Sequence, residues 1–341
     1  MLAILADDLT GALDAAAPFA GRGLSTEIAI TVDGIAAALQ DHPDVLSIDL
    51  ACRDGSVENA RAITKQVIAL LPKAARLFKK IDSRLKGHIA AELDETPFDL
   101  ALVAPAIPEF ERVVADGHVC GFGVPTPISI REKLGPHAEK SLIPDTITQQ
   151  DITSALESPD TAGVDLLIGA RGLAEALAQS MTGRSSAALT ELPAGQALFV
   201  VGSRDPITLA QIDALRGLGG ISHIEAPNGV TGSYPHTLPI TLVQATPGGT
   251  ECSSQEVSRQ LALSVVPYMP GPATTLLLSG GATAEAVMHE MNVSRFRLLG
   301  ECVPGLGVGQ IDGRYVITKS GGFGHPDTLK NIAESILGRI G

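Results

Sequence analysis

The sequence predicts an α/β protein with two domains, each a mostly parallel sheet flanked by helices. Short apolar runs alternate with segments that repeat apolar residues at helical spacing, as expected for strands joined by crossover helices. The 341 residues suffice for two domains of ordinary size. Apolar residues make up 45% of the chain but aromatic residues only 3%, so the core is mostly aliphatic, which suits helices packed on a parallel sheet.

Charge and composition exclude several classes of function. The net charge of −13 argues against a nucleic-acid-binding protein, and an anionic substrate would need a local cluster of Lys and Arg. No apolar run approaches the ~20 residues of a membrane span, and the N-terminus reaches Asp7 and Asp8 too soon for a signal peptide. The cysteines are too widely spaced for a C-x-x-C site. We therefore expect a cytoplasmic protein that binds neither nucleic acid nor membrane.

The first half is expected to form a substrate-binding domain over residues 1–181. A helix with apolar residues from Leu9 to Ala20 follows the first strand, and Ser56 can cap another. A third helix is expected at Leu173–Ala178. The expected strands are Leu2–Ala6, Glu27–Thr31, Val45–Leu50, Leu77–Ile81, Leu100–Ala104 and Asp165–Ile168.

The second half repeats the alternation after a connection rich in Ser, Thr, Ala and Gly, residues 182–195. A second domain is expected over residues 196–341. Its helices should begin near Pro206, follow the glycine pair at 280–281, and end the chain with the apolar stripe that includes Leu329 and Ile336. The expected strands are Ala197–Val201, Thr274–Leu278 and Tyr315–Thr318.

Two acidic residues, Asp7 and Asp8, stand at the carboxyl end of the first expected strand, followed by Thr10. Ligands of open α/β sheets bind outside these strand ends. The carboxylates could accept hydrogen bonds from hydroxyl groups, hold a magnesium-bound water or accept a proton. An Asp at this position could equally well cap the following helix.

A basic segment from Lys79 to His88 follows another strand and concentrates positive charge in an acidic protein. Arginine suits a two-pronged grip on a carboxylate, and lysine acts as a point charge. The segment could also be a solvated charge run on the surface. Its candidate ligand-binding residues are Lys79, Asp82, Ser83, Arg84 and Lys86.

Glycine-rich turns after strands in the second half form the third group. The candidates lie in Gly202–Pro206, Ser279–Thr283 and Lys319–Gly324. Backbone N–H groups in such turns can bind phosphate, although glycines also simply permit tight turns. The chain has neither G-x-x-x-x-G-K-[ST] nor an ordered G-x-G-x-x-G, so a P-loop NTPase or a Rossmann dehydrogenase is not predicted.

Taken together, these segments resemble the four-carbon acid sugar kinase family. The matching segments in the first half are ADDLTGALD (Ala6–Asp14), KKIDSRLKGH (Lys79–His88), APAIPE (Ala104–Glu109) and VADGHVCGFGVP (Val114–Pro125). Those in the second half are GSRDPIT (Gly202–Thr208), SGGATAEAV (Ser279–Val287), GECVPGLGVG (Gly300–Gly309) and TKSGGFG (Thr318–Gly324).

The resemblance implies a sugar-acid-binding N-terminal domain, a nucleotide-binding C-terminal domain and an active site in the cleft between them. It implies ATP-dependent phosphorylation, with Mg²⁺, of an acid such as threonate, erythronate or a 2-oxo-tetronate. Asp7, Asp8, Thr10 and the basic segment would bind the acid, with Asp8 or Asp82 accepting the hydroxyl proton and Asp8 slightly favoured. The implied nucleotide-binding residues are Ser203, Gly280, Gly281, Thr283, Gly305, Gly321, Gly322, Phe323 and Gly324. Two alternative functions are left open, a kinase of another polyol acid and a non-catalytic sensor of sugar acid or nucleotide. A homo-oligomeric assembly is also left open.

Overall fold

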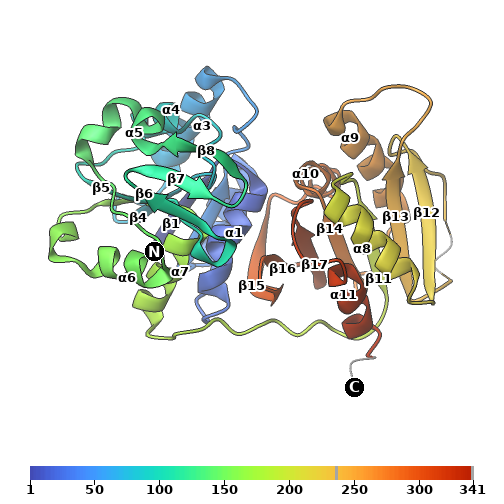
Figure 1. Cartoon of the computed structure of the whole chain (residues 1–341). Coiled ribbons are helices and arrows are strands. Elements are labelled where there is room, and N and C mark those ends of the chain that lie inside the picture. Colours follow the sequence, from blue (N-terminus) through green and yellow to red (C-terminus); the bar gives the residue numbers. More distant parts are fainter. Residues whose placement is uncertain (235–236, 339–341) are drawn as a thin grey trace. The chain divides into compact units, whose positions relative to one another are not determined.

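The computed structural model describes residues 1–234 and 237–338 (Figure 1). The chain forms two compact units, Met1–Ala188 and Leu189–Gly341. Residues 235–236 and 339–341 of the expected second domain lie outside the described residues. No helix in the described ranges is long and apolar enough to cross a membrane.

The first unit is built on a parallel sheet with the strand order β2-β3-β1-β4-β10-β5-β9. The strand order reverses at β1, which lies between β3 and β4, and ligand sites of open α/β sheets are found at such points. The strands are β1 (Leu2–Ala6), β2 (Thr26–Ala29), β3 (Val45–Asp49), β4 (Arg76–Lys80), β5 (Ala101–Ala104), β9 (Ser141–Leu142) and β10 (Leu166–Gly169).

Helices cover both faces of this sheet, because its strands are buried on both sides. Ser47 in β3 donates a hydrogen bond to the carbonyl of Ala12 in α1, so α1 lies on that face. The alternate residues Leu46 and Ile48 pack with the apolar residues of α2 and α3 on the opposite face. The helices are α1 (Leu9–Ala20), α2 (Val32–Gln40), α3 (Val57–Leu70), α4 (Ile89–Asp94), α5 (Ile130–Leu134), α6 (Gln149–Glu157) and α7 (Arg171–Thr182).

A small antiparallel sheet is also part of the first unit. It consists of β6 (Arg112–Ala115), β7 (His118–Gly121) and β8 (Val124–Ser129). Asp116 and Gly117 join the first two strands with φ angles of 50° and 70°, the left-handed conformation that a tight hairpin turn requires. This sheet was not expected from the sequence.

The second unit has a mixed sheet with the order β12-β13-β11-β14-β17-β16-β15. The first five strands in this order are parallel, and β16 and β15 continue the sheet as antiparallel strands. The strands are β11 (Ala197–Val201), β12 (Ile221–Pro227), β13 (Ile240–Thr246), β14 (Thr275–Ser279), β15 (Arg295–Val303), β16 (Leu306–Ile311) and β17 (Arg314–Lys319).

Two helix pairs flank this second sheet. Apolar residues of α8 (Pro206–Arg216) and α11 (Thr328–Ile336) share one core cluster with Phe199, Leu277 and Ile317 from the strands. Helices α9 (Ser254–Val265) and α10 (Gly281–Glu290) pack against each other and against β13 and β14.

The predicted fold class is confirmed, and every expected strand is present with its ends shifted by no more than two residues. The expected Leu77–Ile81, for example, is Arg76–Lys80. Four strands of the second unit were missed: β12, β13, β15 and β16. The residues of β12 are mostly half-buried, so this strand lacks the continuous apolar run by which the buried strands are found.

Arg22 is expected to stabilise the first unit. Its side chain is 1% exposed and donates to the carbonyls of Pro18 (3.0 Å) and Arg184 (2.8 Å) and to the Glu175 carboxylate, linking α1, α7 and the chain after α7. Arg22→Met should lower the free energy of unfolding by about 2–4 kcal/mol in urea denaturation followed by circular dichroism, because buried acceptors lose their donor.

Arg61→Met is the matched control, since Arg61 pairs with Asp94 through a side chain that is 44% exposed. It should change stability by less than about 1 kcal/mol. Equal stabilities of the two variants would contradict the role given to Arg22.

Candidate functional site

Asp7 and Asp8 lie at the carboxyl end of β1, where Arg53 binds both carboxylates. Arg53 comes from the loop between β3 and α3, and its Nε and Nη2 donate to the two Asp7 oxygens at 2.9 and 2.7 Å. Its Nη1 donates to Asp8. Arg53 was not among the residues expected at the site from the sequence. The rule that strand ends meet at one edge of a parallel sheet could have found it, because Arg53 follows the expected strand Val45–Leu50 closely.

Asp7 is a fixed negative charge in this arrangement. It is 2% exposed, and burial by itself would raise its pKa. The hydrogen bonds from Arg53 and the charges of Lys79, Arg53 and Lys80 outweigh burial and lower the pKa below its ordinary value. A carboxylate held ionised, with both oxygens already occupied, suits the positioning of other groups better than proton transfer.

Asp8 is the N-terminal cap of α1. Its Oδ1 accepts from the backbone N–H of Gly11 at 2.7 Å, and its Oδ2 accepts from the Thr10 hydroxyl at 2.8 Å and from Arg53. The capping role considered for this pair therefore belongs to Asp8. Both of its oxygens already accept hydrogen bonds, and the proton-acceptor role expected for Asp8 stays a prediction.

Lys79 lies inside the first unit rather than at its surface, where we expected it to bind the acid. Its side chain is 0% exposed, and its ammonium group pairs with Glu92, which is 1% exposed, and donates to the carbonyl of Leu5 at 3.3 Å. Burial lowers the pKa of Lys79, but the Glu92 and Asp7 charges raise it above its ordinary value. The position in β4 explains this placement, because strands of this sheet are buried on both faces.

The loop after β4 turns around Asp82. Its Oδ1 accepts from the backbone N–H groups of Arg84 at 2.9 Å and Lys86 at 3.4 Å. The side chains of Arg84 and Lys86 are exposed, so the loop presents two cations to solvent. Gly87, with a φ of 88°, lets the loop pass close to Asp7, where an added Cβ would lie 2.7 Å from Oδ2.

Arg112, the first residue of β6 in the small antiparallel sheet, contacts the same loop. Its Nη1 donates to the Ser83 hydroxyl at 2.5 Å, and its Nη2 donates to the carbonyl of Phe122 at 3.0 Å. Burial and the charge of Arg84 lower its pKa, partly offset by Asp82. Ser83 is thus occupied by a protein donor. No sequence signal identified Arg112, because its place depends on the fold of β6–β8.

Three turns of the second unit meet at the carboxyl ends of β11, β14 and β17. The N–H of Gly202 donates to the carbonyl of Ser279 at 3.1 Å, and the N–H of Gly280 donates to the carbonyl of Lys319 at 2.9 Å. An added Cβ at Gly321 would lie 2.4 Å from the Ser203 hydroxyl oxygen. The structure therefore brings together Ser203, Gly280 and Gly321, as expected for a single phosphate site.

The other expected nucleotide-binding residues occupy different positions around these turns. Thr283 is buried in α10, which Gly281 begins, and its side chain packs under Gly202 and Gly280 rather than at the surface. Phe323 covers Gly305, where an added Cβ would lie 2.2 Å from the ring. Gly322 is exposed and Gly324 is half-buried, with a φ of 92°.

Lys319, the last residue of β17, is buried under the turn that follows this strand and donates hydrogen bonds to it. Its side chain is 1% exposed and donates to Thr208 Oγ1 (3.2 Å) and to the carbonyls of Ser320 (3.0 Å) and Gly321 (3.1 Å). Among the described residues it has no ion pair. Burial lowers its pKa to about 8, partly offset by the charge of Asp205. A buried cation bonded only to neutral oxygens favours the arrival of an anion.

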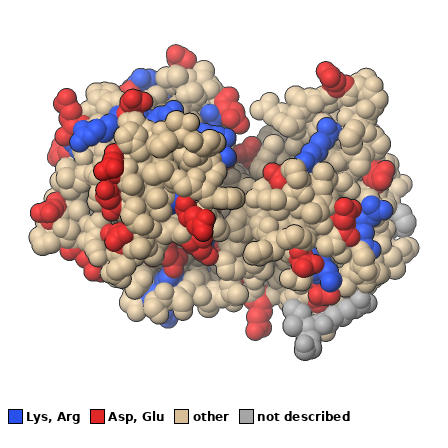
Figure 2. Space-filling model, in the orientation of Figure 1, with Lys and Arg blue, Asp and Glu red and all other residues tan. Residues whose placement is uncertain are grey.

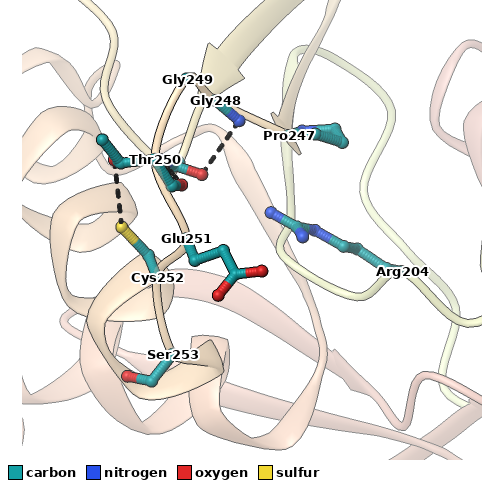
Figure 3. A pocket seen from close by; sticks show the side chains of 9 residues that line it. Arg204, Pro247, Gly248, Gly249, Thr250, Glu251, Cys252 and Ser253 are labelled. Carbon is teal, nitrogen blue, oxygen red and sulfur yellow. Dashed lines mark hydrogen bonds between the residues drawn. The ribbon is translucent and has the colours of Figure 1, made fainter.

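A pocket of about 630 Å³ opens beside these turns in the second unit (Figure 3). It is lined by Arg204, Asn228 and the segment 247–253. Arg204 directly follows Ser203, so the pocket adjoins the expected phosphate site. None of the pocket residues was named as a ligand-binding residue from the sequence.

The distribution of charge agrees with local anion sites. On the face shown in Figure 2, Lys and Arg occur in small groups among Asp and Glu rather than as a continuous basic surface. No group of three or more His, Cys, Asp or Glu residues in the described ranges could hold a metal ion by itself.

Comparisons with known proteins agree with the two-domain organisation. A family model described as a sugar-binding N-terminal domain matches residues 2–150, and one described as a nucleotide-binding C-terminal domain matches residues 230–329. The chain belongs to the four-carbon acid sugar kinase family. The resemblance inferred from the sequence is thereby confirmed.

Two relatives of known activity match nearly the whole chain, and a third matches about one third of it. The D-threonate kinase of Bordetella bronchiseptica is 25% identical, with 99% of this chain and 98% of the relative aligned. The D-threonate kinase of Salmonella typhimurium is 26% identical, with 96% of each chain aligned. A 3-oxo-tetronate kinase of Haemophilus influenzae is 29% identical over 35% of this chain and 31% of its own.

Two solved structures share the fold. A Haemophilus influenzae protein aligns with a TM-score of 0.73 and 18% identity, covering 98% of this chain and 100% of its own. A Salmonella typhimurium protein aligns with a TM-score of 0.75 and 17% identity, covering 97% of this chain and 98% of its own. At these identities the similarity establishes the fold alone.

The buried pair in the first unit should behave as a structural pair. Lys79→Met leaves the Glu92 carboxylate buried without its partner and should cost about 3–5 kcal/mol of unfolding free energy. The double variant Lys79→Met with Glu92→Leu should recover most of this loss, measured by urea denaturation. A fully stable Lys79→Met protein with weakened acid binding would instead support the original ligand-binding role.

Lys319 should make nucleotide binding depend on pH. Phosphate favours the charged ammonium, so the affinity for ATP should fall as the pH rises through about 8, the pKa of Lys319. Lys319→Met should weaken ATP binding about tenfold or more near pH 7 and flatten this profile, both measured by calorimetry.

Two further measurements separate this role from general damage. Arg216→Met removes an exposed cation at the far end of α8 and should leave both the affinity and its pH profile unchanged. The pKa of Lys319 is lower in the folded protein than its usual 10.5, so wild-type stability should rise with pH between about 8 and 10.5, and Lys319→Met should lose this rise. An unaltered pH profile of ATP binding in the variant would refute the role.

Proposed function

We propose that this protein is an ATP-dependent kinase that phosphorylates a hydroxyl group of a small, four-carbon sugar acid such as threonate, erythronate or a 2-oxo-tetronate. The observation that carries the proposal is the convergence of three strand-end turns on Ser203, above the buried ammonium group of Lys319. The names of the family's two domains and of the D-threonate kinase relatives support the same reaction.

The first unit provides a site for the acid. Arg84 and Lys86 are exposed cations whose backbone N–H groups are anchored on Asp82, so they can bind a carboxylate with little ordering of the loop. Arg112 adds a third cation that Ser83 and Phe122 hold in place. Asp7, Asp8 and Thr10 then order the adjacent edge of the sheet through Arg53, rather than binding the carboxylate directly.

Asp82 is the proposed proton acceptor. Its Oδ1 is occupied by the loop, whereas its Oδ2 has no hydrogen-bond partner within the described part of the chain. In the proposed transfer, the acid's hydroxyl oxygen bonds to the terminal phosphorus of ATP, the bond from that phosphorus to the bridging oxygen breaks, and the hydroxyl proton passes to Asp82. Such reactions depend mainly on positioning and on charge stabilisation.

The second unit provides the proposed site for ATP. Backbone N–H groups near Gly280 and Gly321–Gly324 would bind phosphate oxygens, with Lys319 compensating their charge. Magnesium usually binds through phosphates and one or two carboxylates. Asp205 fits this need, since its Oδ1 accepts from the N–H of Ile207 and its Oδ2 lies toward the turn at Gly322. Magnesium would neutralise charge on the phosphates.

The proposed kinase brings the acid and the nucleotide together for phosphoryl transfer. Two alternatives differ from it in substrate or in turnover. A kinase of another small polyol acid would share both sites, and a sensor would bind the same ligands without releasing ADP.

A coupled assay of ADP release tests the proposal across a panel of four-carbon acids, with neutral polyols as controls. We expect ADP release with at least one acid and none with the neutral analogues. In this assay Arg84→Met or Lys86→Met should raise the KM of the acid about ten- to a hundredfold, because a charge-assisted hydrogen bond contributes about 1.5–3 kcal/mol. Asp82→Asn should lower kcat with a smaller effect on KM.

Lys73→Met, which removes an exposed cation before β4, should leave the kinetics unchanged. Binding of acid and ATP without any ADP release would favour the sensor. If the three site variants matched the wild type within about twofold while folding normally, the proposed acid site would be wrong.

A further inference from the structure

Two adjacent lysines at the end of β4 lie in different surroundings. Side chains alternate between the two faces of a strand, so Lys79 and Lys80 leave the sheet on opposite sides. Lys79 lies on the side of α4, where its ammonium group pairs with Glu92. Lys80 lies on the side of α1, where its Nζ would be 3.2 Å from a Cβ added to Gly11. The pairing that explains the first lysine therefore does not explain the second.

Lys80 is a buried cation without an ion pair. It is 4% exposed, and its ammonium group donates to the carbonyl of Ile81 at 3.1 Å. Within the described residues this is its one hydrogen bond, and no carboxylate there pairs with it. Because an ammonium group has three N–H donors, two of them remain for another acceptor. A buried cation bonded to a single neutral oxygen favours the arrival of an anion.

The carboxylates on the neighbouring elements are bound by arginines instead. Asp7 and Asp8 follow β1, which pairs with β4, and Arg53 binds both of them. Asp14, one turn further along α1, pairs with Arg171 at 3.3 Å. These acidic side chains are thus occupied, and a ligand is left to supply the counter-charge of the buried lysine.

The ammonium group of Lys80 lies beside the N-terminal end of α1, a helix of 12 residues. The Asp8 side chain accepts from the N–H of Gly11 there. The N–H groups of Leu9 and Thr10 precede the first intrahelical bond and have no acceptor in the ranges 1–234 and 237–338. Backbone N–H groups at a helix N-terminus bind phosphate, and here a buried cation accompanies them.

The chemistry of this place differs from that of the loop around Asp82, where the carboxylate of the acid is proposed to bind. The planar fork of an arginine such as Arg84 matches a carboxylate, whereas lysine acts as a point charge on phosphate. A phosphoryl group carries a charge of about −1.5 to −2 at pH 7 and offers three acceptor oxygens. One ammonium group and two N–H groups can bind these oxygens.

We propose that Lys80 and the N-terminal end of α1 bind the phosphoryl group as it is transferred to the acid, so that the first unit holds the phosphorylated product through both of its anionic ends. The proposal rests on the kinase reaction proposed above. The hydroxyl oxygen of the acid forms the bond to phosphorus, ADP leaves with the electrons of the broken bond, and the proton passes to Asp82. Lys80 is then a catalytic residue, while Arg84 and Lys86 bind the carboxylate.

Calorimetry of the full-length protein without nucleotide can compare an acid with its phosphate ester. The acid is the one that releases most ADP in the panel, and the ester is the product formed from it. Threonate and its 4-phosphate ester serve if no acid is turned over. The wild type should bind the ester about tenfold or more tightly than the acid. In Lys80→Met this preference should fall to about twofold or less, while the affinity for the acid stays within about twofold of wild type.

Four further variants show where the phosphate is bound. Lys80→Arg keeps the charge and should retain most of the preference for the ester. Arg84→Met should weaken acid and ester by similar factors, because both ligands carry the carboxylate. Lys319→Met should leave the preference unchanged, since this lysine belongs to the proposed nucleotide site. Lys65→Met, which removes an exposed cation on α3, should behave as wild type.

Thermal melting and steady-state kinetics separate catalysis from damage to the fold. Lys80→Met replaces a buried cation that has no ion pair by an apolar side chain, so its melting temperature should be within about 2 °C of wild type or above it. Lys80→Gln, which can still donate to the carbonyl of Ile81, repeats the test if Lys80→Met melts lower. In the ADP assay the kcat of the folded variant should fall about tenfold or more, with the KM of the acid within about twofold.

The outcomes distinguish this inference from the proposed function. If an acid releases ADP but the wild type does not prefer the ester, or Lys80→Met keeps the preference, the assignment of Lys80 is wrong and the kinase stands. Equal weakening of acid and ester in Lys80→Met would overturn the assignment by placing the carboxylate there. A preference lost in Lys319→Met instead would overturn it by placing the phosphate in the second unit. A preference that depends on Lys80 without any ADP release would support the phosphate site and refute the kinase.

Discussion

Parallel pairing of buried strands is the constraint on which the rest of this structure depends. It directs the carboxyl ends of neighbouring strands to one edge of each sheet, and the polar residues that follow those strands therefore meet although they are far apart in the sequence. In the first unit this brings Asp7, Arg53 and Asp82 to one edge. In the second unit it brings Ser203, Gly280 and Gly321 together.

The two units place their buried charges differently. In the first unit Asp7 and Lys79 each have a close partner, Arg53 and Glu92, so the charges compensate one another within the protein. In the second unit Lys319 is bonded only to neutral oxygens. A site that leaves a buried cation without an ion-pair partner prefers an anionic ligand, whereas a compensated cluster mainly fixes the geometry of the residues around it.

This contrast agrees with a kinase that binds its two substrates in two different domains. The acid needs exposed cations on an ordered loop, and the proposed cations are Arg84 and Lys86 on the loop around Asp82. The nucleotide needs backbone N–H groups, and the turns around Ser203 are the proposed source of these groups. Because the overall charge of the protein is −13, the attraction for both anionic substrates has to come from these local arrangements.

The sequence by itself determined the fold class and most of the buried strands, and it indicated the segments proposed to carry the two sites, because continuous apolar runs and strand-end motifs are local signals. It could not separate Lys79 from Arg84 within one basic segment, since only the pairing of β4 on both sides buries the former. It also missed Arg53, Arg112 and the pocket around Arg204 and Glu251, whose members come from separate loops. Tertiary structure decided these, because burial and the meeting of distant loops depend on the packing of the whole sheet.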